Sequence, residues 1–238
     1  MNTAPPPTAN TAVQAAIRPD YSPEQRAHWL TCHEKFVRLA RQGGVNVVFF
    51  GDSLTDYWRE RGRSRWDRYF APLQAVNFGI GGDRTQQVLW RIEHGELEGI
   101  TPKVVVLLIG SNNLTPGLSE NSLTSKNSPT ETVAGVAAII AGLRRRLPQS
   151  RLLLHAILPR AEPTDPIRRA ISETNAGLAR LADGRMVRFV DLGGVFLSPD
   201  GTLSREIMPD LLHLSARGYA IWAAALQAPL NLKTAVRR

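Results

Sequence analysis

Ser53 stands directly behind a short apolar run, in the stretch VVFFGDSLT that spans Val47–Thr55. A serine hydroxyl is a weak nucleophile at neutral pH unless a base takes its proton and a third group orients that base. Among the five histidines, His213 alone lies in a predicted loop, and Asp210 precedes it by three residues. Residues at i and i+3 of a helical turn share a face. The spacing therefore predicts a triad of Ser53, His213 and Asp210.

Hydrogen-bond donors follow the next two apolar runs. NFGIGGDRT holds Gly82 within a cluster of glycines, and GSNN holds Asn112 and Asn113. Backbone N–H groups and side-chain amides are the donors that stabilise the oxyanion of acyl transfer. A dinucleotide-binding loop would need a sixth-position glycine, and counting from Gly79 places Arg84 there. We therefore read these segments as parts of an acyl-transfer site.

Each candidate residue could also have a purely structural role. Ser53 could serve only as a helix cap, and Asn113 is better explained as a turn residue than as a donor. His155, within LLLHAIL, is read as a hydrogen-bonded interior histidine. Asp191 also follows an apolar run and is the rival of Asp210 for the acid of the triad, but Asp210 is much nearer to the histidine in sequence.

Short apolar, β-branched runs alternate with longer amphipathic stretches. The apolar runs are Val45–Phe50, Ala75–Phe78, Val104–Ile109, Leu152–Ile157 and Val187–Val190. The amphipathic stretches are Pro23–Gln42, Tyr57–Tyr69, Thr85–Glu93, Thr130–Leu147, Pro166–Ala182 and Ser215–Leu226. Strands that are apolar on both faces and separated by helices predict a parallel sheet covered on both sides. We expect a three-layer α/β/α sandwich with five parallel strands, whose ligands bind beyond the carboxyl ends of the strands.

Composition bounds the remaining possibilities. The net charge is +8, but the arginines are dispersed without a nucleic-acid-binding motif, so we expect a solvated basic face and no nucleic-acid partner. A single cysteine, Cys32, excludes an intrachain disulfide. No apolar run approaches the ~20 residues of a membrane span, so we expect no stable membrane insertion and a soluble chain, cytoplasmic or exported after removal of a signal peptide. We expect a flexible tail over 1–20, one domain over 21–232 and a basic tail over 233–238.

These motifs together resemble the SGNH, or GDSL, hydrolase superfamily, whose four marker blocks correspond to GDSLT, the glycine loop, GSNN and DLLH. A closer likeness is to the group formed by the catalytic α subunits of brain-type platelet-activating-factor acetylhydrolase and their bacterial relatives. Residues 77–113 read almost continuously like that group, as do LPR at Leu158–Arg160 and HLSARGYAIW. The resemblance covers about Val45–Trp222.

The resemblance implies a flavodoxin-like sandwich and a serine esterase that hydrolyses short-chain, acetyl esters of a carbohydrate or a phospholipid through an acyl-enzyme. Ser53 would be the nucleophile, His213 the base and Asp210 its orienting acid. The backbone N–H groups of Ser53 and Gly82 and the side-chain amide of Asn112 would hold the oxyanion. The expected ligand is a small acyl ester, and no metal or organic cofactor is implied. A homodimer is suggested by family likeness alone.

Two alternatives stay open at this point. One is a lysophospholipase or thioesterase of the same superfamily, and the other is an acetylhydrolase-like binding subunit without turnover.

The polar loop Thr115–Pro129 is longer than we expect of the acetylhydrolase group. We hypothesise that it shapes the leaving-group side of the pocket and favours a polar alcohol such as a sugar. A surface insertion without such a role is the alternative.

Overall fold

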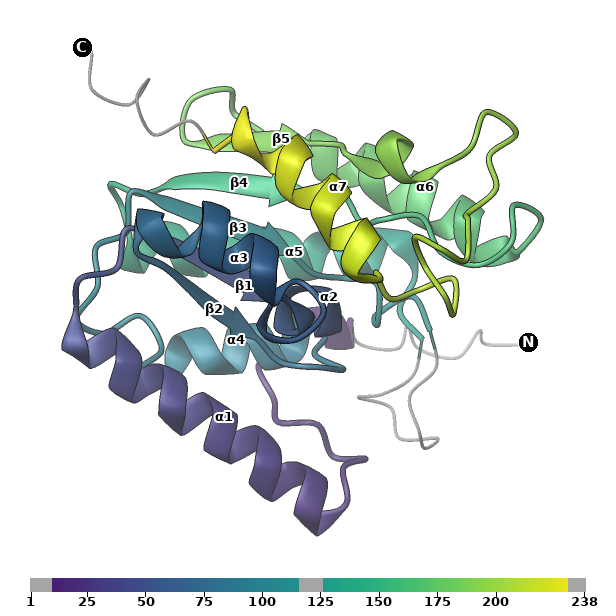
Figure 1. Cartoon of the computed structure of the whole chain (residues 1–238). Helices are drawn as coiled ribbons and strands as arrows, with labels where there is room; N and C mark the ends of the chain where they lie inside the picture. Colours follow the sequence, from purple (N-terminus) through teal and green to yellow (C-terminus); the bar gives the residue numbers. More distant parts are fainter. Residues whose placement is uncertain (1–9, 116–125, 231–238) are drawn as a thin grey trace, which may run out of the picture.

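Five parallel strands form the centre of the molecule (Figure 1). The computed structural model describes residues 10–115 and 126–230 of the chain. The strands lie in the order β2-β1-β3-β4-β5. Their bounds are Val47–Gly51 (β1), Ala75–Gly79 (β2), Val104–Leu108 (β3), Arg151–His155 (β4) and Val187–Val190 (β5). All four pairings are parallel, so the carboxyl ends of the strands meet at one edge of the sheet, as expected.

Helices cover both faces of this sheet, which confirms the predicted three-layer α/β/α fold. One face is covered by α1 (Pro23–Gln42), α4 (Thr85–Glu93), α5 (Pro129–Arg146) and α6 (Pro166–Ala179), and the other by α2 (Ser53–Asp56), α3 (Arg63–Tyr69) and α7 (Ala216–Gln227). Successive strand residues point to opposite faces. In β1, Val48 and Phe50 therefore join the first core, whereas Val47 and Phe49 join the second.

The predicted helix over Tyr57–Tyr69 is interrupted. After α2 the chain forms one 3-10 turn at Tyr57–Arg59, breaks at Glu60, and resumes as α3. The break allows Trp58 to enter the second core, where its ring lies 4.6 Å from that of Tyr219. Burial of one large aromatic ring outweighs the continuity of a short exposed helix, because such a helix gains little from its own hydrogen bonds.

Residues 10–20 form a strap against α4, although the sequence predicts a flexible tail there. A short 3-10 turn at Thr11–Val13 buries Ala12 completely. The hydroxyl of Thr85 donates to the Ala12 carbonyl at 2.8 Å, and the Ala16 N–H donates to the Gln86 carbonyl at 3.2 Å. These hydrogen bonds to a neighbouring helix compensate for the low apolar content of the segment. The remainder of both expected tails, residues 1–9 and 231–238, lies outside the described residues.

Strand β2 is an edge strand whose outer carbonyl groups are covered by a side chain. Arg59 donates to the carbonyl of Asn77 at 2.9 Å and to that of Gly79 at 2.8 Å. Its guanidinium also lies over the ring of Phe36, 5.3 Å from the centroid.

Within the described residues, none of the helices combines the length and apolarity that crossing a membrane requires.

Candidate active site

The structure brings Ser53, His213 and Asp210 together in one hydrogen-bonded chain. The Oγ of Ser53 lies 3.0 Å from Nε2 of His213, and Nδ1 of His213 lies 2.7 Å from Oδ2 of Asp210. With its proton on Nδ1 donated to the carboxylate, the neutral imidazole presents the lone pair of Nε2 to the serine hydroxyl. This is the arrangement in which a serine can become a nucleophile.

Asp210 and His213 lie in a turn, whereas the sequence argument assumed one turn of helix. Leu211 between them has a φ of 58°, in the left-handed region. Oδ1 of Asp210 accepts the backbone N–H of Leu212 at 3.0 Å and of His213 at 2.7 Å. Partial burial raises the pKa of Asp210, but these hydrogen bonds and the one from the imidazole lower it to about 2. The Asp210 carboxylate is therefore ionised at neutral pH.

The sharp turn from β1 into α2 holds Ser53. Gly51 is needed here because a Cβ would lie 2.4 Å from the Leu108 carbonyl oxygen and 2.2 Å from the hydroxyl of Thr55. Asp52 caps α2, since its Oδ1 accepts the backbone N–H of Leu54 at 3.0 Å. Sequence analysis considered Ser53 itself as a helix cap, but the cap is Asp52, which leaves the serine hydroxyl available for His213.

Two backbone N–H groups near Ser53 have no hydrogen-bond partner within the described part of the chain, those of Ser53 and Gly82. Gly82 has a φ of 81°, a conformation that glycine adopts without strain. The Gly81 carbonyl accepts the hydroxyl of Tyr21 at 3.3 Å. Because the C=O and N–H of one peptide point in opposite directions, this bond turns the Gly82 N–H away from Tyr21. Both groups are available as oxyanion donors.

The amide of Asn112 is fixed by the same loop. Its Nδ2 donates to the backbone carbonyl of Asp83 at 2.9 Å, which leaves its second hydrogen for another acceptor. Asn113 points elsewhere. Its Oδ1 accepts the N–H of Thr85, and its Nδ2 lies within hydrogen-bond distance of the side chains of Thr85, Gln86 and Asn127. The distinction that sequence analysis drew between the two asparagines matches these contacts.

Asp83 anchors this loop to the interior through its side chain, a contact that sequence reasoning missed. Its Oδ1 accepts the indole N–H of Trp29 at 2.7 Å, and its Oδ2 lies 3.3 Å from Nε of Arg91. Complete burial raises the pKa of Asp83 to about 7, against the opposing effects of the Arg91 charge and the Trp29 hydrogen bond. Its position immediately after the glycines, in GGDRT, was the available signal.

Comparison with known proteins agrees with this geometry. A model of the GDSL-like lipase/acylhydrolase family matches residues 49–221. The chain belongs to this family. Platelet-activating factor acetylhydrolase IB subunit alpha1 of Homo sapiens is 37% identical over 203 residues, covering 85% of this chain and 82% of the relative. Subunit alpha2 of Rattus norvegicus is 36% identical over 196 residues, covering 81% and 79%.

A solved structure from Streptococcus pneumonia has a TM-score of 0.69 and 25% sequence identity, and the match covers 86% of this chain and 95% of that chain. As a member of the GDSL-like lipase/acylhydrolase family, the protein is a carboxylic ester hydrolase. The resemblance recognised in the sequence is thereby confirmed, and so is the choice of an enzyme over a binding subunit without turnover.

Two further candidates of the sequence lie apart from Ser53 in this GDSL-like hydrolase. His155 is fully buried, and its Nε2 accepts the indole N–H of Trp222 at 3.1 Å. Burial lowers the pKa of His155 to about 4, so the ring is neutral and structural, as predicted. Asp191 accepts the backbone N–H of Gly193 at 2.8 Å and makes no hydrogen bond with His213.

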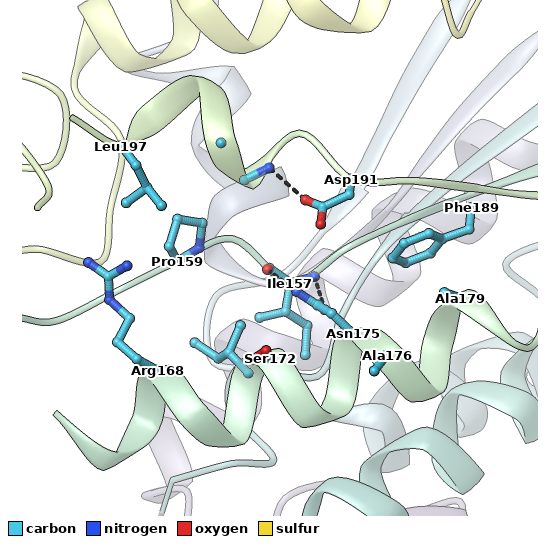
Figure 2. Close-up of a pocket in the computed structure, with 13 residues that line it drawn as sticks. Ile157, Pro159, Arg168, Ser172, Asn175, Ala176, Ala179, Phe189, Asp191 and Leu197 are labelled. Carbon is cyan, nitrogen blue, oxygen red and sulfur yellow. Dashed lines mark hydrogen bonds between the residues drawn. The ribbon is translucent and has the colours of Figure 1, made fainter. Parts of the chain in front are cut away.

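Asp191 instead lines a pocket of about 460 Å³ between α6 and the segment after β5. Figure 2 shows Arg168, Ser172 and Asn175 extending from α6 toward it. None of its lining residues belongs to the Ser53 site.

Most of the loop Thr115–Pro129, which sequence analysis assigned to the leaving-group side, lies outside the described residues. Among the described residues, no three His, Cys, Asp or Glu side chains form a metal-binding group.

Proposed function

We propose that this ester hydrolase cleaves short-chain, acetyl-type esters through an acyl-enzyme on Ser53. The observation that carries the proposal is the continuous hydrogen-bonded chain from Ser53 through His213 to Asp210. Ser53 Oγ attacks the acyl carbon while its proton passes to Nε2 of His213. The tetrahedral intermediate then expels the alcohol, whose oxygen takes that proton. Water, deprotonated by the same imidazole, then attacks the acyl carbon, and the second intermediate expels Ser53 Oγ, which takes that proton back from Nε2 as the carboxylic acid leaves.

The oxyanion of both tetrahedral intermediates is held, in this proposal, by the N–H groups of Ser53 and Gly82 and by the amide of Asn112. All three come from rigid elements behind strand ends, so they need little reorganisation when charge develops. Asp210 stays ionised and stabilises the imidazolium of His213.

A short acyl group is supported by the comparison with known proteins. The relatives that are 36–38% identical over most of the chain are named acetylhydrolase subunits. A lysophospholipase or thioesterase would need a longer acyl channel beside Ser53.

The test is hydrolysis of p-nitrophenyl acetate, butyrate and octanoate by the wild type, by Ser53→Ala and by Ser64→Ala, an exposed serine on α3 that serves as the matched control. We expect the acetate to be cleaved fastest, and we expect Ser53→Ala alone to lose activity, by about 10⁴-fold or more. Preference for octanoate would favour the lysophospholipase or thioesterase reading, and full activity in Ser53→Ala would remove Ser53 from the mechanism.

A further inference from the structure

A second pocket, of about 240 Å³, lies between the start of α1 and the glycine loop. Its lining includes Tyr21, Gln25, His28, Asp56, Tyr57 and Gly81. Gly81 is near the nucleophile, because a Cβ on it would lie 3.9 Å from the Cβ of Ser53. Tyr57 is near the base, because its ring centroid lies 5.2 Å from that of His213. The pocket therefore opens beside both the proposed nucleophile, Ser53, and the proposed base, His213.

The alcohol must leave from this side if the proposed function holds. The departing oxygen receives its proton from His213, so it lies within hydrogen-bond distance of Nε2 in the transition state. Tyr57 contacts that imidazole and also forms one wall of the pocket. We propose that this pocket is the leaving-group subsite and that it takes a neutral, polyhydroxylated alcohol.

Charge neutrality follows from Asp56, which is the carboxylate in the lining. Its Oδ2 accepts the Gly81 N–H at 3.0 Å, and its Oδ1 is paired with Arg59. The described lining residues therefore offer no unpaired charge to an alcohol of either sign. The guanidinium of Arg61 lies over the ring of Tyr57, 5.1 Å from its centroid, but Arg61 is not a lining residue. Neither charged class is therefore favoured.

Free hydrogen-bonding groups at the rim of the pocket favour an alcohol that carries several hydroxyl groups. The hydroxyl of Tyr57 makes no hydrogen bond within the described residues. The Oε1 of Gln25 accepts the Ser22 N–H, and its Nε2 is left free to donate. His28 is exposed, and with its Nε2 lying 3.6 Å from Sγ of Cys32, its Nδ1 remains for a ligand. The Tyr21 and Tyr57 rings supply apolar faces. Aromatic faces with donors and acceptors at their edges suit the alternating C–H and O–H surface of one sugar-sized ring.

Binding to an inactive chain tests the subsite without requiring turnover. In the Ser53→Ala background, the affinity for a monoacetylated methyl glucoside is measured by calorimetry with and without Gln25→Ala or His28→Ala. We expect each substitution to weaken binding about three- to tenfold, since each removes one hydrogen bond. Gln42→Ala, at the exposed far end of the same helix, is the matched control and is expected to leave the affinity unchanged.

A second arm compares acetyl esters that differ only in the alcohol. Wild-type kcat/KM for the acetylated glucoside is expected to exceed that for acetylcholine and for O-acetyl-lactate, and Gln25→Ala is expected to reduce this preference. Equal affinity of the Gln25→Ala and Gln42→Ala chains, or tighter binding of acetylcholine, would overturn the subsite. If the wild type shows no Ser53-dependent hydrolysis of acetate esters but the glucoside still binds in this pocket, the proposed function is overturned and the subsite is not.

Discussion

Two loops approach Ser53, and they are held in place by different means. The loop with Asp210 and His213 is exposed, with 53% of the Asp210 side chain accessible, and the hydrogen bonds of Asp210 join near neighbours in sequence. The loop with Gly82 and Asp83 is anchored in the interior by buried side chains, Trp29 from far away in the chain and Arg91 from the following helix. Under the proposed mechanism, we therefore expect the first loop to contribute to chemistry with little effect on stability, and the second to contribute to both.

The largest separation of activity from stability is expected at Asp210. Asp210→Asn keeps an Oδ1 that accepts the N–H groups of Leu212 and His213, so the turn is preserved. The amide cannot accept the Nδ1–H in the same way, which removes the correct imidazole tautomer, and kcat is expected to fall about 10⁴-fold. Thermal unfolding checks that Tm falls only slightly, because the charge of this half-exposed carboxylate contributes little to stability. Asp200→Asn, another exposed aspartate whose Oδ1 accepts a backbone N–H, is the control for both measurements.

The two adjacent asparagines should respond in opposite ways. Asn112→Ala removes an oxyanion donor, so kcat is expected to fall about 10²–10³-fold with a small change in stability. Asn113→Ala leaves several buried polar groups unpaired and is expected to cost about 3 kcal/mol of unfolding free energy. Steady-state kinetics and urea unfolding of both variants test this, and equal kcat losses in the two would contradict the assignment of Asn112.

Asp83→Ala should affect both properties, because the side chain joins the oxyanion loop to the interior. The substitution leaves the indole N–H of Trp29 and the guanidinium of Arg91 without this buried partner, and breaking a buried pair typically costs about 3–5 kcal/mol of unfolding free energy. We expect such a loss, with kcat about tenfold lower and KM little changed. Asp67→Ala, which breaks the exposed pair with Arg63, is the control and should alter neither quantity. Normal kcat in a destabilised Asp83→Ala would limit Asp83 to a structural role.

The two loops also differ in their response to pH. The pKa of Asp210 is lowered, so its stabilising effect is present above about pH 4 and is lost as the pH falls toward 2. Burial raises the pKa of Asp52 to about 7, against the hydrogen bond from Leu54 and the charge of Arg160. Burial also raises the pKa of Asp83 to about 7. Their contribution is present below about pH 4 and is lost as the pH rises through 7, by up to about 1.4 kcal/mol per pH unit for each group.

Urea unfolding at several values between pH 4 and 8 measures this slope. The decrease of stability with pH is expected to become smaller in Asp52→Asn, which retains the cap on Leu54. Asp83 still makes stability fall with pH in this variant, and His155, whose pKa is lowered, acts in the opposite direction. An unchanged slope would mean that Asp52 is not the group that titrates.

The sequence predicts the elements that local pattern determines. The strands and the helices Pro23–Gln42 and Thr85–Glu93 follow from apolar periodicity and capping residues, and the triad residues follow from their places behind those elements. What depends on distant partners is not predicted. The strap at residues 10–20 looks like a tail because its stability comes from hydrogen bonds to α4, and Leu211 carries no sign of its left-handed backbone.

Arg59 gives the edge of the sheet a protection of its own. An edge strand exposes a row of backbone groups to which a strand of another molecule can add, which leads to aggregation. By holding the outward carbonyls of Asn77 and Gly79, the guanidinium occupies acceptors that an incoming strand would need. The same side chain pairs with Asp56 beside the candidate leaving-group subsite. Colloidal stability and the shape of that pocket are thereby linked through a single arginine.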